Sequence, residues 1–264
     1  LPTIEAALQG ERPDLIAVSQ GPGLMGPLLM GLTTAKSLSL AWGIPYVGVN
    51  HVEAHLYAAM MHHTPTFPAL GLVVSGGHTF LARIDDEQTY SVIASTVDDA
   101  VGEAFDKVAS MLGLPYPGGP AIERLAKEGD PHAYPFRAGR VRGDRLAFSF
   151  SGLKTNVRYT TRDVDIEKER ANIAASFQHA ALSDIAAKTL AAASAGETIY
   201  VGGGVSQSRY LRTLFGDHPV IFPRESALCL DNGAMIAGLG YHRFKRHGSS
   251  PLDLTPFTRH FSKK

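Results

Sequence analysis

The sequence predicts an α/β fold with two subdomains that hold a nucleotide between them. Short apolar runs of strand type alternate with longer helical patterns along the chain, which is typical of α/β proteins. Two of the apolar runs end in glycine-rich turns, at Val73–Thr79 and at Val201–Ser206. Because glycine has no Cβ, such a turn brings backbone N–H groups close to an anionic ligand. Two turns of this kind in one chain therefore indicate a nucleotide cleft with a subdomain on each side.

Composition limits the classes of protein that this chain can represent. Its 264 residues, 44% of them hydrophobic, suffice for one or two compact domains. Lysine and arginine total 25, as do aspartate and glutamate, so a nucleic-acid partner would need a local basic patch. The single cysteine, Cys229, excludes an intramolecular disulfide and fits a reducing compartment. No apolar run approaches the roughly 20 residues of a membrane span, and no signal peptide is visible, so we expect a cytoplasmic protein.

The first part of the chain reads as two strands, each followed by a helix. An entry turn at Arg12–Asp14 precedes the first strand, and Gln20–Gly26 is a glycine turn. Asn50 is a good N-cap for the second of these helices, which contains His51 and His55. The predicted elements are a strand at 14–19, a helix at 27–42, a strand at 44–49 and a helix that starts at 51.

The second part of the chain follows a proline-containing loop at 64–68 and again alternates strands and helices. Gly113 stops one predicted helix, and a rigid proline turn at 115–120 leads into the next. The predicted elements are strands at 69–75, 79–84 and 90–95, then helices at 101–112, 121–127, 172–193, 207–215 and 232–239. The seam near residues 62–68 predicts two domains, residues 1–66 and residues 67–264, with the last helix packing back on the first domain.

Two histidines in the helix that starts at residue 51 are candidate metal ligands. His51 and His55 are four residues apart, so their imidazoles lie on one helix face about one turn apart and suit one divalent ion. The alternative is a pair of partly buried, hydrogen-bonded histidines. Glu53 lies roughly 200° around the helix from His51, so it cannot act as the base of a zinc protease over that ion.

Four carboxylates surround the start of the helix predicted at 101–112: Asp98, Asp99, Glu103 and Asp106. Favourable charge at a helix N-terminus explains Asp98 and Asp99 without any function. Asp106 lies deeper in the helix, beside Phe105, and is the functional candidate of the four.

Two further features allow both a structural and a functional interpretation. Asp231 opens a helix of small residues, either as its N-cap or as a ligand at the carboxyl end of a strand, where α/β sites gather. Ser149 and Ser151 could belong to a nucleophile loop. Their segment has no G-x-S-x-G elbow, which disfavours that role.

A set of motifs occurs in a fixed order along essentially the whole chain. They are Gln20–Gly26, His51–His55, Val74–Thr79, Gly102–Lys107, Pro117–Pro120, Phe148–Lys154, Gly203–Ser206 and Asp231–Asn232. In this order they resemble the TsaD family, the tRNA adenosine threonylcarbamoyltransferases of bacteria. His78 and Phe105–Lys107 favour the bacterial branch over the archaeal and eukaryotic one.

The resemblance implies a fold, a reaction and a cofactor. The fold is that of actin, Hsp70 and sugar kinases (ASKHA), with two α/β subdomains around a nucleotide cleft. The reaction transfers a threonylcarbamoyl group from threonylcarbamoyl-AMP to N6 of adenosine 37 in tRNAs that read codons starting with A. The cofactor is one divalent metal ion, iron or zinc, which the resemblance assigns to His51, His55 and Asp231.

The resemblance also implies a site for the adenylate. Its sugar would be held by Asp106, Gly119 and Glu123. Ser208 stands where the family usually has asparagine against the adenosine, and serine offers less reach. His78, beside the first glycine turn, is our hypothesis for a general base; its alternative role is to orient that turn. The residues expected to line the adenylate are Val73, Val74, Ser75, Gly76 and Gly77.

The family normally carries a further segment before Leu1, so we expect the first subdomain to be incomplete in this chain. The partners that the resemblance implies are tRNA, a TsaB-like paralogue, a TsaE-like ATPase and the threonylcarbamoyl-AMP synthase that supplies the adenylate.

Two other functions fit the same fold, an ATP-dependent small-molecule kinase and a non-catalytic scaffold paralogue. A kinase would have no shared role for His51 and His55. The intact metal ligands and Asp106 argue against a scaffold. Two basic surfaces are candidates for tRNA contact, and a solvated face or a disordered tail explains each of them equally well. Their residues are Arg137, Arg140, Arg142 and Arg145, and then Arg243, Lys245, Arg246, Arg259, Lys263 and Lys264.

Overall fold

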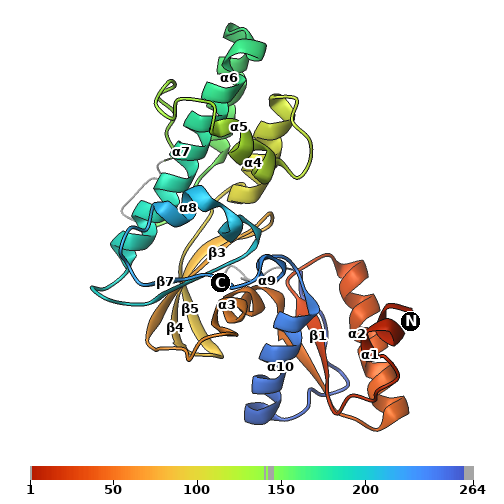
Figure 1. Cartoon of the computed structure of the whole chain (residues 1–264). Helices are drawn as coiled ribbons and strands as arrows, with labels where there is room; N and C mark the ends of the chain where they lie inside the picture. Colours follow the sequence, from red (N-terminus) through yellow and green to blue (C-terminus); the bar gives the residue numbers. More distant parts are fainter. Residues whose placement is uncertain (1, 140, 142–145, 259–264) are drawn as a thin grey trace. The chain divides into compact units, whose positions relative to one another are not determined.

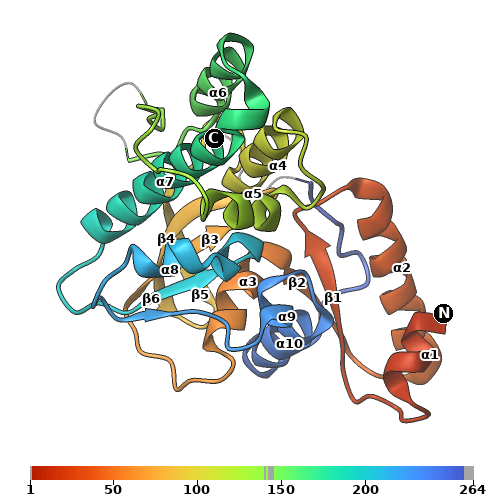
Figure 2. The same ribbon diagram turned by 45° about the horizontal axis from the view of Figure 1, so that its top comes forward.

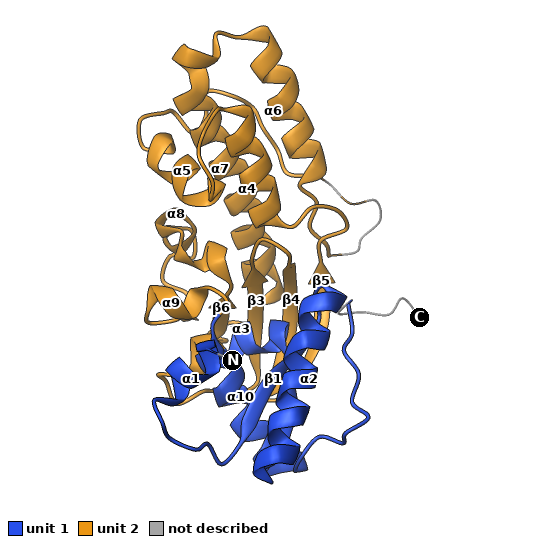
Figure 3. Cartoon of the chain, turned by 90° about the vertical axis from the view of Figure 1, so that its right-hand side faces the viewer, with its two compact units in different colours: residues 1–57, 232–264 blue, residues 58–231 orange. Residues whose placement is uncertain are grey.

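The computed structural model describes residues 2–139, 141 and 146–258 and divides into two compact units. Unit 1 comprises residues 1–57 and 232–264, and unit 2 comprises residues 58–231 (Figure 3). The division into domains at residues 66 and 67 stays a prediction. Several residues of the two expected basic surfaces lie outside the described part of the chain: Arg140, Arg142, Arg145, Arg259, Lys263 and Lys264.

Unit 1 is built around a small parallel sheet between two helices (Figure 1). Val18 of the first strand packs with the helix α2, whereas a Cβ on Gly240 of α10 would lie 2.5 Å from the Cβ of Ala17. Neighbouring residues of a strand face opposite sides, so α2 and α10 cover opposite faces. The elements are α1 (Pro2–Leu8), β1 (Ile16–Gly21), α2 (Met25–Trp42), β2 (Tyr46–Asn50), α3 (His51–Met60, which continues into unit 2) and α10 (Gly233–His247).

The start of α3 confirms the predicted N-cap. The Asn50 side-chain oxygen accepts hydrogen bonds from the backbone N–H groups of Val52 at 2.9 Å and Glu53 at 3.3 Å. These bonds satisfy donors that have no partner within the first helical turn. The helix therefore begins at His51, directly after β2, and carries both candidate histidines.

Unit 2 contains a five-stranded mixed sheet with β3 at its centre (Figure 2). The strand order is β5-β4-β3-β6-β7; the β3–β4 and β4–β5 pairs are antiparallel, and the β3–β6 and β6–β7 pairs are parallel. All residues of β3 are buried, as its continuous apolar sequence predicts. The strands are β3 (Ala69–Val74), β4 (Thr79–Asp86), β5 (Thr89–Ser95), β6 (Ile199–Gly202) and β7 (Val220–Ile221).

The main core of unit 2 lies between this sheet and its helices. Leu72 of the sheet, Phe105 of α4 and Phe177 of α7 belong to one buried cluster. No helix among the described residues combines the length and the apolar character needed to cross a bilayer. The helices are α4 (Val101–Met111), α5 (Gly118–Ala126), α6 (Ser151–Asp163), α7 (Ile166–Ala192), a 3₁₀ turn (Gly204–Gln207), α8 (Arg209–Thr213) and α9 (Ser226–Cys229).

Several predicted helix boundaries are wrong: α5 starts at Gly118 instead of 121, for example, and α10 continues to His247, eight residues past the predicted 239. The long helix starts at Ile166, six residues before the predicted Asn172. The helix predicted at 207–215 is a 3₁₀ turn followed by α8, because Ser208 has a non-helical backbone, with a ψ of 120°, and its side chain caps α8 through the N–H of Leu211. Asn232, not Asp231, is the N-cap of α10: its side chain accepts from the N–H of Met235 at 2.8 Å.

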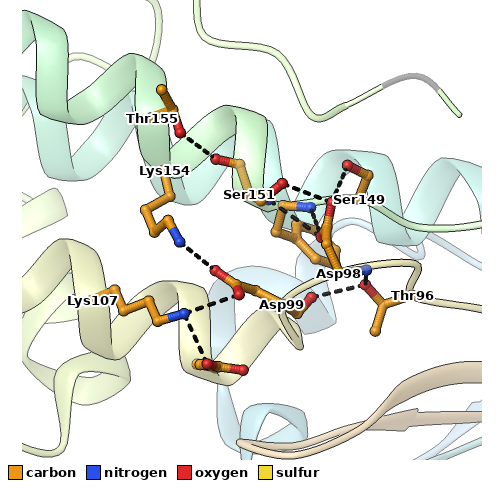
Figure 4. Close-up of polar contacts among 10 residues, drawn as sticks. Thr96, Asp98, Asp99, Lys107, Ser149, Ser151, Lys154 and Thr155 are labelled. Atoms are coloured by element: carbon orange, nitrogen blue, oxygen red, sulfur yellow. Dashed lines mark hydrogen bonds and ion pairs between the residues drawn. The ribbon is translucent and has the colours of Figure 1, made fainter.

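Asp98 anchors the N-terminus of α6 rather than that of α4 (Figure 4). Its carboxylate accepts from the hydroxyls of Ser149 at 2.6 Å and Ser151 at 2.8 Å, and from the N–H of Phe150 at 2.8 Å. Burial alone would raise the pKa of Asp98, but these hydrogen bonds outweigh it and hold the pKa below its usual value. The acid that precedes α4 in the sequence therefore fixes where α6 begins.

We predict that Asp98→Ala lowers the free energy of unfolding by about 1 kcal/mol at pH 7, as the loss of an exposed cap does. A carboxyl whose pKa is lowered by folding stabilises the protein above its unfolded pKa, about 3.9, and loses that contribution as the pH falls toward its folded pKa. The difference from the unchanged protein should therefore shrink below pH 4 in urea unfolding curves. Asp217→Ala, at an exposed loop position, is the control and should show no such trend.

A second prediction concerns the close packing of α5 on α4. A Cβ on Gly118 would lie 2.7 Å from the Cβ of Ala109 and 2.7 Å from the Cα of Asp106, whereas one on Gly119 would meet nothing within 4 Å. Gly118→Ala should therefore cost roughly 1–3 kcal/mol through overpacking. Gly119→Ala should be neutral or slightly stabilising in thermal unfolding; equal losses for the two variants would contradict this account.

Candidate functional site

The first glycine turn is a tight connection between β3 and β4. The N–H of Ser75 donates to the carbonyl of His78 at 2.8 Å, and the N–H of His78 donates to the Ser75 hydroxyl at 3.0 Å. Gly76 and Gly77 lie at the tip, where an added Cβ would meet nothing within 4 Å. The backbone of His78 thus closes the turn, and the two glycines are exposed at its tip.

The second glycine turn lies directly against the end of β3. Gly203 has a φ of +92°, and a Cβ there would lie 2.4 Å from the carbonyl oxygen of Val74. On the other side, a Cβ on Gly102 of α4 would lie 2.7 Å from the carbonyl oxygen of Ser75. Only glycine permits these approaches. As predicted, both turns follow strands, and they meet at the carboxyl ends of the neighbouring parallel strands β3 and β6.

A cavity of about 240 Å³ adjoins these turns within unit 2. Two carboxylates on its wall tie the surrounding helices together. Asp106 of α4 accepts from the N–H of Gly118 at 2.7 Å, at the start of α5. Glu123 of α5 accepts from the Ser208 hydroxyl at 3.2 Å and from the N–H of Tyr210 at 2.9 Å, at the start of α8. The cavity wall is therefore a chain of three helices joined through two acids.

The structure gathers part of the predicted substrate site in this cavity. Val73 and Val74 are fully buried in β3, behind the turn. Ser75, Gly77 and His78 belong to the turn but are not among the residues that line the cavity. The predicted residues that do line it are Gly76, Asp106, Gly119, Glu123 and Ser208.

Sequence reasoning missed several residues of the cavity wall. Gln178 of α7 is only 5% exposed, and its side-chain oxygen has no hydrogen-bond partner among the described residues. The sequence did carry a signal for Gln178, because it is a polar residue beside the apolar face of a long helix. Tyr116, which is 85% exposed, lies in the proline turn and carried no such signal. The other lining residues that were missed are Gly102, Phe105, Pro117, Pro120, Gln207 and Leu230, whereas Gly204 and Val205 belong to the second glycine turn, which was predicted to face the nucleotide.

His51 and His55 are candidate ligands of one metal ion, and both lie on α3 in unit 1. The rings of His51 and His55 are 4.8 Å apart between centroids and meet edge to face. Asp231, the third residue that could bind such an ion, is the last residue of unit 2. Asp231 follows the short helix α9, not a strand as expected. Glu53 is an ion-pair partner of Arg243 at 2.7 Å, in keeping with its exclusion as a protease base.

The remaining candidates have structural partners. Ser149 and Ser151 both donate to Asp98 at the start of α6. Asp99 pairs with Lys107 at 2.9 Å and with Lys154 at 2.8 Å. This carboxylate therefore links α4 to α6, which is a different role from the predicted charge at the start of α4.

Comparison with known proteins assigns the family. The family model for TsaD, tRNA N6-adenosine threonylcarbamoyltransferase, matches residues 3–238. A protein of that name from Protochlamydia amoebophila is 53% identical over 97% of this chain and 79% of its own length. Another from Moorella thermoacetica is 46% identical over 91% of this chain and 74% of its own length.

A solved structure supports the fold. The crystal structure of full-length HypF in its phosphate- and nucleotide-bound form is similar to 94% of this chain and 42% of HypF, with a TM-score of 0.68 at 16% identity. At that identity the likeness concerns the fold alone, and it agrees with the predicted ASKHA architecture. The chain therefore has an ASKHA fold and belongs to the TsaD family, the tRNA N6-adenosine threonylcarbamoyltransferases.

Proposed function

We propose that this chain transfers a threonylcarbamoyl group from threonylcarbamoyl-AMP to N6 of adenosine 37 in tRNAs that read codons starting with A. The observation that carries the proposal is the family match, which spans residues 3–238 and so includes every candidate substrate and metal residue. In the reaction a bond forms between N6 and the carbamoyl carbon. The bond from that carbon to the phosphate oxygen breaks, AMP leaves, and the amine loses a proton.

The cavity of unit 2 fits the adenylate half of the donor substrate. We infer that Asp106 and Glu123 accept hydrogen bonds from the ribose hydroxyls, since both line the cavity and carboxylates are strong acceptors. Ser208 lies on the same wall, within hydrogen-bond distance of Glu123. The backbone N–H groups of the first glycine turn, at Gly76 and Gly77, would donate to the phosphate. The attacking amine is a poor nucleophile, so holding the donor in place should supply much of the acceleration.

We infer that His51, His55 and Asp231 hold the metal ion. Two imidazoles and one carboxylate suit iron or zinc, and the two imidazoles lie side by side on α3. When bound, such an ion supplies a Lewis acid that can polarise a carbonyl oxygen. His78 stays a hypothesis for the base that takes the amine proton. We also propose that a TsaB-like paralogue, a TsaE-like ATPase and a threonylcarbamoyl-AMP synthase work with this chain.

The direct test is a reconstitution. The purified protein is incubated with tRNA, threonylcarbamoyl-AMP and the proposed partner proteins, and the tRNA is then digested to nucleosides for mass spectrometry. Threonylcarbamoyl-adenosine is the expected product. ATP-dependent phosphorylation of a small molecule, without this product, would instead favour a kinase.

We predict that His51→Ala and Asp231→Ala each lower the bound metal from about one ion per chain to a small fraction of that, because a three-ligand site loses a third of its donors. Formation of threonylcarbamoyl-adenosine should fall with it. Metal is measured by mass spectrometry of the desalted protein. His63→Ala, at an exposed position just after α3, is the matched control and should keep both metal and product.

A separate prediction concerns the adenylate cavity. Asp106→Ala should weaken binding of AMP roughly tenfold or more, since it removes a charged acceptor worth about 1.5–3 kcal/mol. Isothermal calorimetry with AMP measures this, and metal content should not change. Asp85→Ala, at an exposed position on β4, is the control. Equal AMP affinities for Asp106→Ala and the unchanged protein would place the nucleotide elsewhere.

A further inference from the structure

A second, polar hollow of about 480 Å³ lies between α4 and α6 in unit 2, which we term the α4–α6 groove. None of the described residues that line it is an acid, and four of them are cations: Lys107, Lys154, Arg158 and Arg162. The chain as a whole has equal numbers of cationic and anionic side chains, so this is a local concentration of positive charge. Such a patch is the usual electrostatic footprint of a nucleic-acid partner.

Three of the cations form a regular stripe on α6. Lys154, Arg158 and Arg162 are spaced four residues apart, which places them on one helix face with a rise of about 6 Å between neighbours. That spacing is comparable to the separation of successive phosphates along a nucleic-acid strand. The three cations can therefore contact successive phosphates of a nucleic-acid backbone, and they need not all bind a single anion.

The two lysines at one end of the groove are held in position by acids behind them (Figure 4). Asp99, whose side chain is 17% exposed, pairs with Lys107 at 2.9 Å and with Lys154 at 2.8 Å. Lys107 also pairs with Glu103 at 2.8 Å. Burial would raise the pKa of Asp99, but its bonds to Lys154 and Lys107 outweigh this and lower the pKa. The acids thus fix the lysines and balance their charge.

The two arginines carry the net charge of the groove. Arg158 and Arg162 are both exposed, and neither forms an ion pair with a described acid. Arg162 lies over the ring of Tyr159, 5.8 Å from its centroid, and Tyr159 is 57% exposed. An exposed aromatic ring beside free guanidinium groups suits RNA, because guanidinium binds phosphate and the ring can stack on a base.

We propose that the α4–α6 groove binds the phosphate backbone of the tRNA substrate, an inference that rests on the proposed function. The same helix links the groove to the adenylate cavity: Asp106 lines the cavity, and Lys107, the next residue of α4, lines the groove. The two sites are thus about one helix diameter apart, roughly 10 Å. A tRNA that presents one base near the cavity has neighbouring phosphates within reach of the groove.

The test compares tRNA binding by the complete, metal-loaded protein with tRNA binding by a variant that lacks the charges of Arg158 and Arg162. Arg158→Gln with Arg162→Gln should raise the dissociation constant for tRNA roughly tenfold or more at 0.1 M salt. The slope of the logarithm of the binding constant against the logarithm of the salt concentration should flatten by about 1.5, as expected for the loss of two phosphate contacts. Fluorescence anisotropy with labelled tRNA measures both quantities.

Two matched variants distinguish tRNA binding in the groove from a general effect of positive charge on the protein surface. Arg158→Lys with Arg162→Lys keeps the charges and should bind tRNA nearly as well as the unchanged protein. Lys168→Gln with Arg170→Gln removes two charges at the start of α7, where Lys168 pairs with the N-cap residue Asp165 and Arg170 with Glu167, and should change the slope little. Equal losses for the Gln pairs at 158/162 and 168/170 would overturn the groove proposal.

Turnover distinguishes the failure of this inference from the failure of the proposed function. With Arg158→Gln and Arg162→Gln, we expect a higher KM for tRNA, an unchanged kcat and unchanged binding of AMP. If the unchanged protein modifies tRNA and this variant has the same KM and dissociation constant, the groove proposal is wrong. If the unchanged protein binds tRNA through the groove but forms no threonylcarbamoyl-adenosine, the groove stands and the proposed reaction fails.

Discussion

The candidate nucleotide site depends on the close approach of backbone segments around the end of β3. Gly102, Gly118 and Gly203 each stand where a Cβ would lie 2.4–2.7 Å from a neighbouring atom. These contacts bring α4, α5 and the second glycine turn together around one cavity. The cavity therefore depends on the room that these three glycines leave. The helices that pack closely there are the ones that position the cavity acids.

Acids of similar sequence context serve two different purposes in unit 2. Asp98 and Asp99 precede α4, but their partners are hydroxyls, N–H groups and lysines of α6 and α4. Asp106 and Glu123 each accept from a backbone N–H at the start of the following helix. Each of these two also lines the cavity. Asp98 and Asp99 therefore join helices to one another. Asp106 and Glu123 also join helices, and in addition they face the candidate ligand.

The strands, the glycine turns and the N-cap of α3 could be predicted because their signals are local. Asn50 is an example: the residues that it bonds follow it directly in the sequence. The role of Asp98 could not be predicted, since its partners are about 50 residues away and only the fold brings them together. Gln178 was missed for the same reason. The break before α8 was missed because Ser208 has a non-helical backbone within a segment whose pattern predicts one helix.

The charge of the chain constrains how it can select an RNA. Since the totals of basic and acidic residues are equal, attraction over long distances is weak, and affinity has to come from local groups such as Arg158 and Arg162. Contacts to phosphates position a nucleic acid but do not read its sequence. Discrimination between tRNAs must then arise where a base is read, near the reacting amine or on a partner protein. An arginine stripe on α6 would set the register of the RNA, and the cavity on the other side of α4 would hold the donor of the group to be transferred.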